Sequence, residues 1–217
     1  MQMIDVGARG SPLSRKQVDE VYREVLALAP HIQFTPHFID TTGDKDQTTS
    51  LKFLEKTDFF TKEVDEMLLS RQCRIAIHSA KDLPDPLPDG IVIAAITRGV
   101  DPSDSLVLHE DQTFATLPSG ALIACSSIRR EEAIKSLRQD LRFADIRGTI
   151  SQRLDQLFSR KVDGVVIAEA ALIRLGLTGL NRFKIPGETV PLQGKLAVAV
   201  RKGDHEMIRL FANIDYW

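Results

Sequence analysis

The chain has 217 residues, enough for one large domain or two modest ones, and its 43% hydrophobic and 27% charged residues are ordinary for a soluble globular protein. The net charge of −2 argues against a general polyanion binder such as a nucleic-acid-binding protein, so any anion site must be local. Cys73 and Cys125 form no Cys/His cluster, which argues against structural zinc and favours a reducing compartment. Since the sequence has no apolar leader and no run of membrane-spanning length, we predict a cytoplasmic protein that does not bind a membrane.

Short β-branched runs alternate along the chain with segments whose apolar residues recur at helical spacing. The runs predict strands, in chain order, over residues 3–8, 34–39, 75–77, 91–96, 121–125, 141–146, 164–168 and 196–200. Helices are predicted to begin near residues 12, 60, 128, 150, 169 and 205. Residues 41–50 are polar and are predicted to form a loop. The alternation predicts an α/β protein with mixed, mostly parallel sheets.

Two segments that contain proline, residues 101–104 and 186–194, interrupt this alternation and predict crossovers between two lobes. Domain one is predicted over residues 1–99 plus 190–217, and domain two over residues 100–189. The expected architecture is periplasmic-binding-protein-like, with helices flanking each sheet and a cleft between the lobes.

The run from residue 74 to residue 84 is the richest in chemistry. A buried strand is followed at once by His78, Ser79, Lys81 and Asp82. In open α/β sheets, ligands bind at the carboxyl ends of strands. A lysine and an aspartate there can hold an anion and carry out proton chemistry. The alternative is a solvated charge pair, which this stretch alone favours, and His78 is interpreted as a packed or hydrogen-bonded residue.

Cations follow three other predicted strands, at Arg9, at Arg129 with Arg130, and at Arg147. Two arginines in a first helical turn face the positive end of the helix dipole, which disfavours each by roughly 0.3–1 kcal/mol. A bound carboxylate or phosphate would reverse that sign. The alternative is pairing with the two glutamates that follow. Because all these strand ends share one place in the pattern, we interpret them as an anion-binding surface.

Several motifs, taken together and in this order, resemble the porphobilinogen deaminase (hydroxymethylbilane synthase) family. They are Arg9-Gly10-Ser11, IAIHSAKDLP over 75–84, LPDG over 87–90, DPSD over 101–104, CSSIRR over 125–130, IRGT over 146–149 with Arg153, and VPLQG over 190–194. The family condenses four porphobilinogen molecules head to tail into the linear tetrapyrrole hydroxymethylbilane and releases ammonia. The resemblance therefore implies a transferase of haem and tetrapyrrole biosynthesis.

The resemblance also implies roles for individual residues. Asp82 would be the catalytic carboxylate, which assists protonation of the leaving amine. Each pyrrole carries an acetate and a propionate, and arginine can grip a carboxylate with two parallel hydrogen bonds. The residues implied to bind substrate or cofactor are Arg9, Ser11, Lys52, Lys56, Phe60, Ser79, Lys81, Ser126, Ser127, Arg129, Arg130, Arg147, Thr149, Arg153 and Gln193. No metal is implied.

The cofactor implied by the family is dipyrromethane, held through a thioether to a cysteine of a third domain. These 217 residues are expected to lack that domain, so the anchoring cysteine has no counterpart among them. Cys125 stands at a strand end and is a minor candidate for the anchor, although a small buried residue is the favoured interpretation.

Two rival hypotheses remain at this stage. One is a non-catalytic protein that binds pyrrole carboxylates or another anionic ligand on the same scaffold. The other is an inactive remnant, or a subunit whose partner supplies the third domain. Asp82 beside Lys81 favours the enzyme, because binding an anion gains nothing from a carboxylate there. The partner expected for the enzyme is porphobilinogen, and a monomer is expected.

Overall fold

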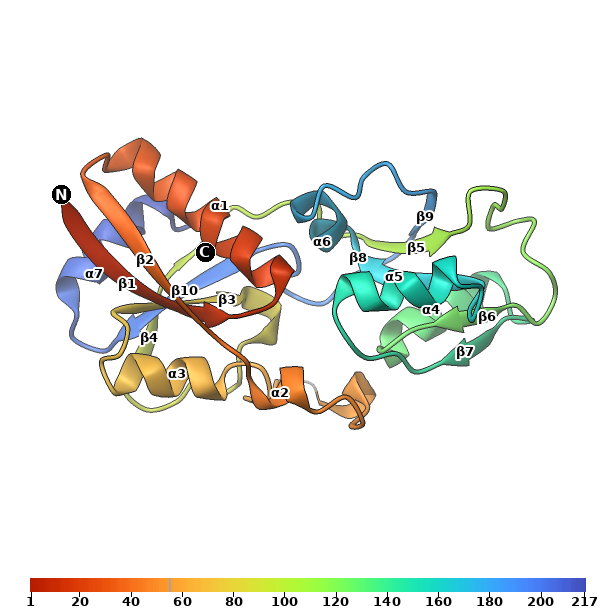
Figure 1. Cartoon of the computed structure of the whole chain (residues 1–217), viewed down its shortest axis with the longest axis horizontal. Coiled ribbons are helices and arrows are strands. Elements are labelled where there is room, and N and C mark those ends of the chain that lie inside the picture. The colour runs from red at the N-terminus through yellow and green to blue at the C-terminus, as the bar shows by residue number, and fades with distance from the viewer. Residues whose placement is uncertain (55) are drawn as a thin grey trace. The chain divides into compact units, whose positions relative to one another are not determined.

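The computed structural model describes residues 1–217 except Glu55. The chain forms two compact units, each built around a five-stranded sheet (Figure 1). Unit 1 consists of residues 1–46, 56–100 and 194–217, and unit 2 of residues 47–55 and 101–193. The segment 47–55 therefore groups with unit 2, although it is flanked in the sequence by parts of unit 1.

The elements of unit 1 are β1 (Gln2–Arg9), α1 (Pro12–Leu28), β2 (Ile32–Ile39), α2 (Thr42–Lys45), α3 (Lys62–Leu69), β3 (Ile75–Ser79), the 3₁₀ helix η2 (Ala80–Asp82), β4 (Ile91–Ile96), β10 (Leu196–Arg201), α7 (His205–Phe211) and η3 (Ala212–Ile214). The strand order is β2-β1-β3-β10-β4. β1 is parallel to β2 and β3, whereas β10 is antiparallel to β3 and β4. The sheet is therefore mixed, as predicted.

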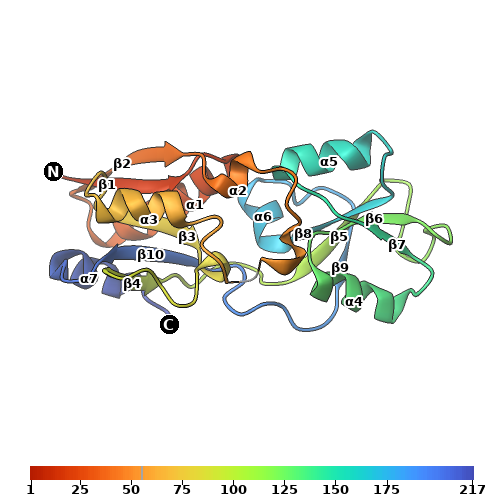
Figure 2. The same ribbon diagram turned by 90° about the horizontal axis from the view of Figure 1, so that it is seen from below.

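Side chains of the unit 1 sheet alternate between two cores. Ile75, Ile77 and Val198 pack with α1 and α7 on one face, while Ala76 and Ala199 pack with α3 on the other. Figure 2 shows α3 in front of the sheet. Since both faces are covered, β3, β4 and β10 are almost continuously apolar, which is why the sequence reveals these strands so clearly.

Helix α1 begins where local chemistry predicts. The Ser11 hydroxyl accepts a hydrogen bond from Ser14 N at 3.2 Å, and Pro12 occupies the first turn. The loop predicted over 41–50 is wrong in its first half, because residues 42–45 form α2. Asp44 accepts from Thr41 N at 3.1 Å, and this reciprocal capping supports one helical turn without an apolar face.

The elements of unit 2 are the 3₁₀ helix η1 (Leu51–Phe53), β5 (Asp104–Leu108), β6 (Leu122–Ala124), α4 (Ile128–Leu137), β7 (Arg142–Ala144), α5 (Ile150–Phe158), β8 (Gly164–Ala168), α6 (Glu169–Arg174) and β9 (Arg182–Ile185). The strand order is β7-β6-β8-β5-β9. β6 is parallel to β7 and β8, whereas β5 is antiparallel to β8 and β9. Strands β5 and β9 are absent from the sequence prediction, because both are short and β5 begins inside the proline-containing break.

The directions of the strands bring the segments that follow several of them to one edge of each sheet. In unit 2, the carboxyl ends of β6, β7 and β8 share an edge with the start of β5, since Asp104 pairs with Ala168 and with Ile185. In unit 1, the ends of β1 and β3 share an edge, with Ser79 opposite Leu196. The polar residues that follow these strands therefore lie at the same edge of their sheet. Within the described residues, none of the helices is long and apolar enough to cross a membrane.

Candidate functional site

Asp82 and Lys81 lie in unit 1 on the turn that follows β3. Ala80 N donates to Lys195 O at 3.0 Å, which anchors this turn to the start of β10. On the other side, the Ser79 hydroxyl accepts from the buried Gln17 amide at 2.8 Å. Asp82 itself is half-buried. The fold thus holds a carboxylate and a neighbouring ammonium group on a fixed turn at the sheet edge, where a ligand can reach them.

Arg9 ends β1 and is held from two sides within unit 1. Its Nε donates to Asp44 Oδ2 at 3.1 Å, and a terminal nitrogen pairs with Asp44 Oδ1. The Phe60 ring centroid lies 4.3 Å from the Arg9 guanidinium carbon. Gly43 is required there, because a Cβ at this position would lie 2.4 Å from the Phe60 ring. Arg9 and Phe60, both predicted to bind ligand, therefore contact each other.

The charge on Asp44 is maintained by its neighbours. Burial raises the pKa of this carboxyl. The hydrogen bond and charge of Arg9, together with hydrogen bonds from Thr41, outweigh the effect of burial and leave the pKa below its ordinary value. Ligand carboxylates near Arg9 would therefore share the guanidinium with a carboxylate that remains ionised.

Two other predicted binding residues of unit 1 have local partners. The Ser11 hydroxyl is occupied by the cap of α1. Lys56 pairs with Asp85 at 3.2 Å, and both side chains are exposed. The ammonium of Lys56 is therefore reachable from solvent, and its surface ion pair is weak enough to be exchanged for a ligand carboxylate.

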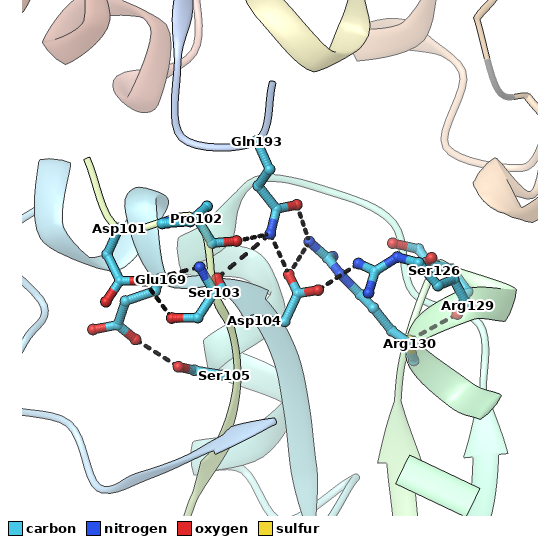
Figure 3. A network of polar contacts seen from close by, with 12 residues as sticks. Asp101, Pro102, Ser103, Asp104, Ser105, Ser126, Arg129, Arg130, Glu169 and Gln193 are labelled. Carbon is cyan, nitrogen blue, oxygen red and sulfur yellow. Dashed lines mark hydrogen bonds and ion pairs between the residues drawn. The ribbon is translucent and has the colours of Figure 1, made fainter. Parts of the chain in front are cut away.

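A polar network at the start of β5 in unit 2 holds three of the predicted residues (Figure 3). Asp104 Oδ1 pairs with Arg130 at 2.7 Å and accepts from Gln193 Nε2 at 2.8 Å, while Asp104 Oδ2 pairs with Arg129. Gln193 also donates to Pro102 O at 2.5 Å. Burial raises the pKa of Asp104, but Arg130 and Arg129 outweigh it and hold the pKa below its usual range.

A second group of arginines lies near the carboxyl ends of β6 and β7, where Arg147 follows β7 and Arg153 reaches from α5 to Ser126. Arg153 donates from Nε to Gly148 O at 2.9 Å and from a terminal nitrogen to the Ser126 hydroxyl at 3.3 Å. Burial, then the charges of Arg130 and Arg147, lower the pKa of Arg153 to about 10. Three guanidinium groups therefore repel one another in one region of unit 2. Such a region favours a bound anion, and carboxylates match the guanidinium geometry best.

A pocket of about 490 Å³ opens beside these arginines within unit 2. Its lining consists of Gln47, Thr48, Asp145, Ile146, Arg147, Gly148, Gln152 and Gln156. Thr149 caps α5 by accepting from Gln152 N at 3.4 Å, so its hydroxyl contributes to the helix start. Arg147 is the predicted binding residue that lines this pocket.

Lys52 and Ser127 complete the predicted set in unit 2. Lys52, on the segment 47–55, forms an ion pair with the buried Glu131 of α4. Ser127 precedes α4, and its carbonyl accepts from the Cys125 thiol at 3.3 Å. Both residues therefore support the first turn of α4, the turn that carries Arg129 and Arg130.

Cys125 is fully buried, and burial raises the pKa of its thiol. Burial likewise raises the pKa of Cys73 to about 11. A thiolate is the nucleophilic form of cysteine, so neither thiol is suited to a covalent attachment at neutral pH. The arginine group of unit 2, by contrast, fits a carboxylate-bearing group such as dipyrromethane.

Sequence reasoning did not select Asp44 or Asp104, the two carboxylates that hold the predicted arginines. Asp44 sits in a polar stretch without an apolar pattern, and Asp104 closes a motif that signals only a chain break. The sequence did hold a signal for Asp104, because the apolar run Leu106–Leu108, which begins two residues after it, marks a buried strand.

Comparison with known proteins gives consistent results. A family model described as "Porphobilinogen deaminase, dipyromethane cofactor binding domain" matches residues 4–209. The chain is 35% identical over 219 residues to porphobilinogen deaminase of Syntrophomonas wolfei, covering 100% of this chain and 72% of the relative. It is 39% identical over 207 residues to porphobilinogen deaminase of Thermus thermophilus, covering 94% and 67%.

The fold is also similar to a solved structure described as the probable amino-acid ABC transporter extracellular-binding protein ytmK from Bacillus subtilis. The TM-score is 0.58 at 14% sequence identity, covering 99% of this chain and 92% of that one. This likeness concerns the fold alone and agrees with the predicted periplasmic-binding-protein-like architecture.

Proposed function

The chain belongs to the porphobilinogen deaminase family, and we propose that it condenses four porphobilinogen molecules into the linear tetrapyrrole hydroxymethylbilane with release of ammonia. The observation that carries this proposal is the gathering of Arg130, Arg147 and Arg153 in unit 2, where burial first, and then the charges of Arg130 and Arg147, lower the pKa of Arg153 to about 10. Porphobilinogen bears an acetate and a propionate, and these carboxylates would relieve the repulsion among the guanidinium groups.

Asp82 is proposed as the catalytic carboxylate. Release of ammonia requires a proton on the leaving amine and leaves positive charge on the pyrrole. A carboxylate can assist the proton transfer and stabilise that charge as it develops. Lys81, adjacent in the sequence, would bind a substrate carboxylate and so orient the amine toward Asp82.

Dipyrromethane is the cofactor named by the matched family domain. When bound, it supplies the primer to which substrate units are added. In this chain, Arg147 and Arg153 with the Ser126 hydroxyl would hold its carboxylates through charge-assisted hydrogen bonds. The other residues proposed to bind substrate or cofactor are Arg9, Ser11, Lys52, Lys56, Phe60, Ser79, Ser127, Arg129, Arg130, Thr149 and Gln193.

We further propose that the protein acts in the cytoplasm as a monomer. The two cysteines are both free and buried, which suits a reducing compartment. Size-exclusion chromatography with light scattering tests the monomer, since a mass of twice 24.2 kDa would refute it.

The direct test is incubation of the purified protein with porphobilinogen, with ammonia and the linear tetrapyrrole followed together. The proposal predicts that both products form, in a ratio of about four ammonia per tetrapyrrole. Porphobilinogen bound at equilibrium without ammonia release would instead favour a binding protein on this scaffold. The Asp82→Asn variant serves as the control for background condensation, because it retains the arginines.

A further inference from the structure

Asp104 is a buried carboxylate at the edge of the unit 2 sheet, and neither the sequence motifs nor the proposed reaction gives it a role. Asp104 is 1% exposed, yet both of its oxygens are used, Oδ1 by Arg130 and Gln193 and Oδ2 by Arg129 (Figure 3). Burying a carboxylate is costly unless it is paired and hydrogen-bonded. Asp104 therefore depends on these three side chains, and they are arranged around it.

Asp104 is fixed more firmly than the residues it holds. It starts β5, an inner strand of the sheet, and pairs with Ala168 on one side and Ile185 on the other. Arg129 and Arg130 have long side chains, and holding such chains in one geometry costs rotamer entropy. A carboxylate built into the sheet removes this freedom before a ligand arrives.

The two arginines are presented differently by this arrangement. Arg129 keeps 29% of its side chain exposed and is fixed a second time by Glu188 O at 2.8 Å. Arg130 keeps only 10% exposed and contacts Gln193 Oε1 at 3.2 Å. Arg129 can therefore bind a ligand through its exposed part, while the positive charge of the more buried Arg130 attracts the ligand.

We propose that Asp104 is a positioning residue that preorganises Arg129 and Arg130 to bind the carboxylates of the substrate. This inference rests on the proposed function and adds to it a residue that acts only through others. One carboxylate aligns two adjacent cations in the first turn of α4, where the helix dipole disfavours them. With Arg147 and Arg153 nearby, the region stays cationic, so the ligand is still attracted.

The primary test compares the steady-state kinetics of Asp104→Asn with those of Glu169→Gln. Glu169 is a matched control, because it is also a buried carboxylate at this edge but binds Arg182 and Ser105 instead. Asp104→Asn is expected to raise KM for porphobilinogen roughly tenfold or more and to change kcat by less than about threefold. Glu169→Gln is expected to lower Tm while leaving KM as in the wild type.

A second variant distinguishes the position of the Asp104 carboxylate from its negative charge. Asp104→Glu keeps the charge but moves the carboxylate by one methylene, so it is also expected to raise KM. A wild-type KM in Asp104→Glu would overturn the proposal, as would equal increases of KM in Asp104→Asn and Glu169→Gln. If Asp104→Asn does not fold, the KM of Asp104→Glu decides alone.

Equilibrium binding distinguishes failure of this inference from failure of the proposed function. Calorimetric titration with porphobilinogen is carried out in the Asp82→Asn background, with and without Asp104→Asn. If the wild type shows no turnover, the proposed function fails, and weaker binding in the double variant still supports positioning. Equal binding in both proteins, or no binding in either, overturns the positioning role.

Discussion

Arg9 and Asp44 form a two-pronged ion pair across 35 residues of sequence within unit 1. The pair joins the end of β1 to the single turn of α2, and the Phe60 ring covers the guanidinium from its other side. A predicted ligand-binding arginine thus carries a counter-ion of its own. The stability of this part of the chain should therefore depend on the charge of Asp44.

Asp44→Asn is expected to destabilise the protein at neutral pH by about 1.5 kcal/mol, the value typical of hydrogen bonds to a charged group. The folded pKa of Asp44 is depressed, so its contribution is present above the unfolded value of about 3.9 and is lost as pH falls through the folded pKa. Urea unfolding at several pH values measures the difference in unfolding free energy between Asp44→Asn and the wild type. Asp40→Asn, which removes an exposed carboxylate nearby, is the control. A difference that persists unchanged in acid would contradict the assignment.

Asp82→Asn should retain the fold and nearly abolish turnover. Loss of a group that acts in proton transfer typically lowers the rate by about 10²–10⁴. Ammonia release from porphobilinogen gives the rate, and thermal unfolding gives the stability. The exposed Asp89, seven residues further on, provides a matched change in Asp89→Asn. Turnover of Asp82→Asn at the rate of Asp89→Asn would remove Asp82 from the catalytic role.

Features set by neighbouring residues could be predicted from the sequence. Ser11 with Pro12 marks the start of α1, Asp204 caps α7 by accepting from Met207 N at 3.2 Å, and Gly176 follows α6 with φ +70°. Each depends on contacts over a few residues, so local patterns reveal them.

Features set by distant pairings could not be predicted in this way. The segment 47–55 groups with unit 2 and places Lys52 against Glu131, a pairing across 79 positions that no periodicity encodes. The carboxylate that holds Arg129 and Arg130 likewise comes from β5, whereas both arginines are on α4. The arginines were recognised as candidates, but their preorganisation by Asp104 became visible only with the register of β5.

Arg147→Gln and Arg153→Gln are each expected to weaken porphobilinogen binding by roughly 10–100-fold, because each removes charge-assisted hydrogen bonds to a carboxylate. Arg153→Gln also removes the hydrogen bonds to Gly148 O and to the Ser126 hydroxyl, so thermal unfolding of this variant is measured alongside its affinity. Titration calorimetry measures the affinity. Arg142→Gln, an exposed change at the opposite end of β7, is the control. Affinity equal to that of Arg142→Gln would exclude these arginines from the site.

Intact mass spectrometry should show no pyrrole covalently attached to Cys125. The thiol is fully buried, donates to Ser127 O at 3.3 Å and has a pKa raised by burial, so its thiolate is scarce at neutral pH. We therefore expect a dipyrrole mass on the native protein, held by the arginines, that disappears on denaturation in both the wild type and Cys125→Ser. A dipyrrole mass that survives denaturation in the wild type but not in Cys125→Ser would establish Cys125 as the anchor. Alkylation before and after unfolding gives an independent check, since both cysteines should react only once the chain is unfolded.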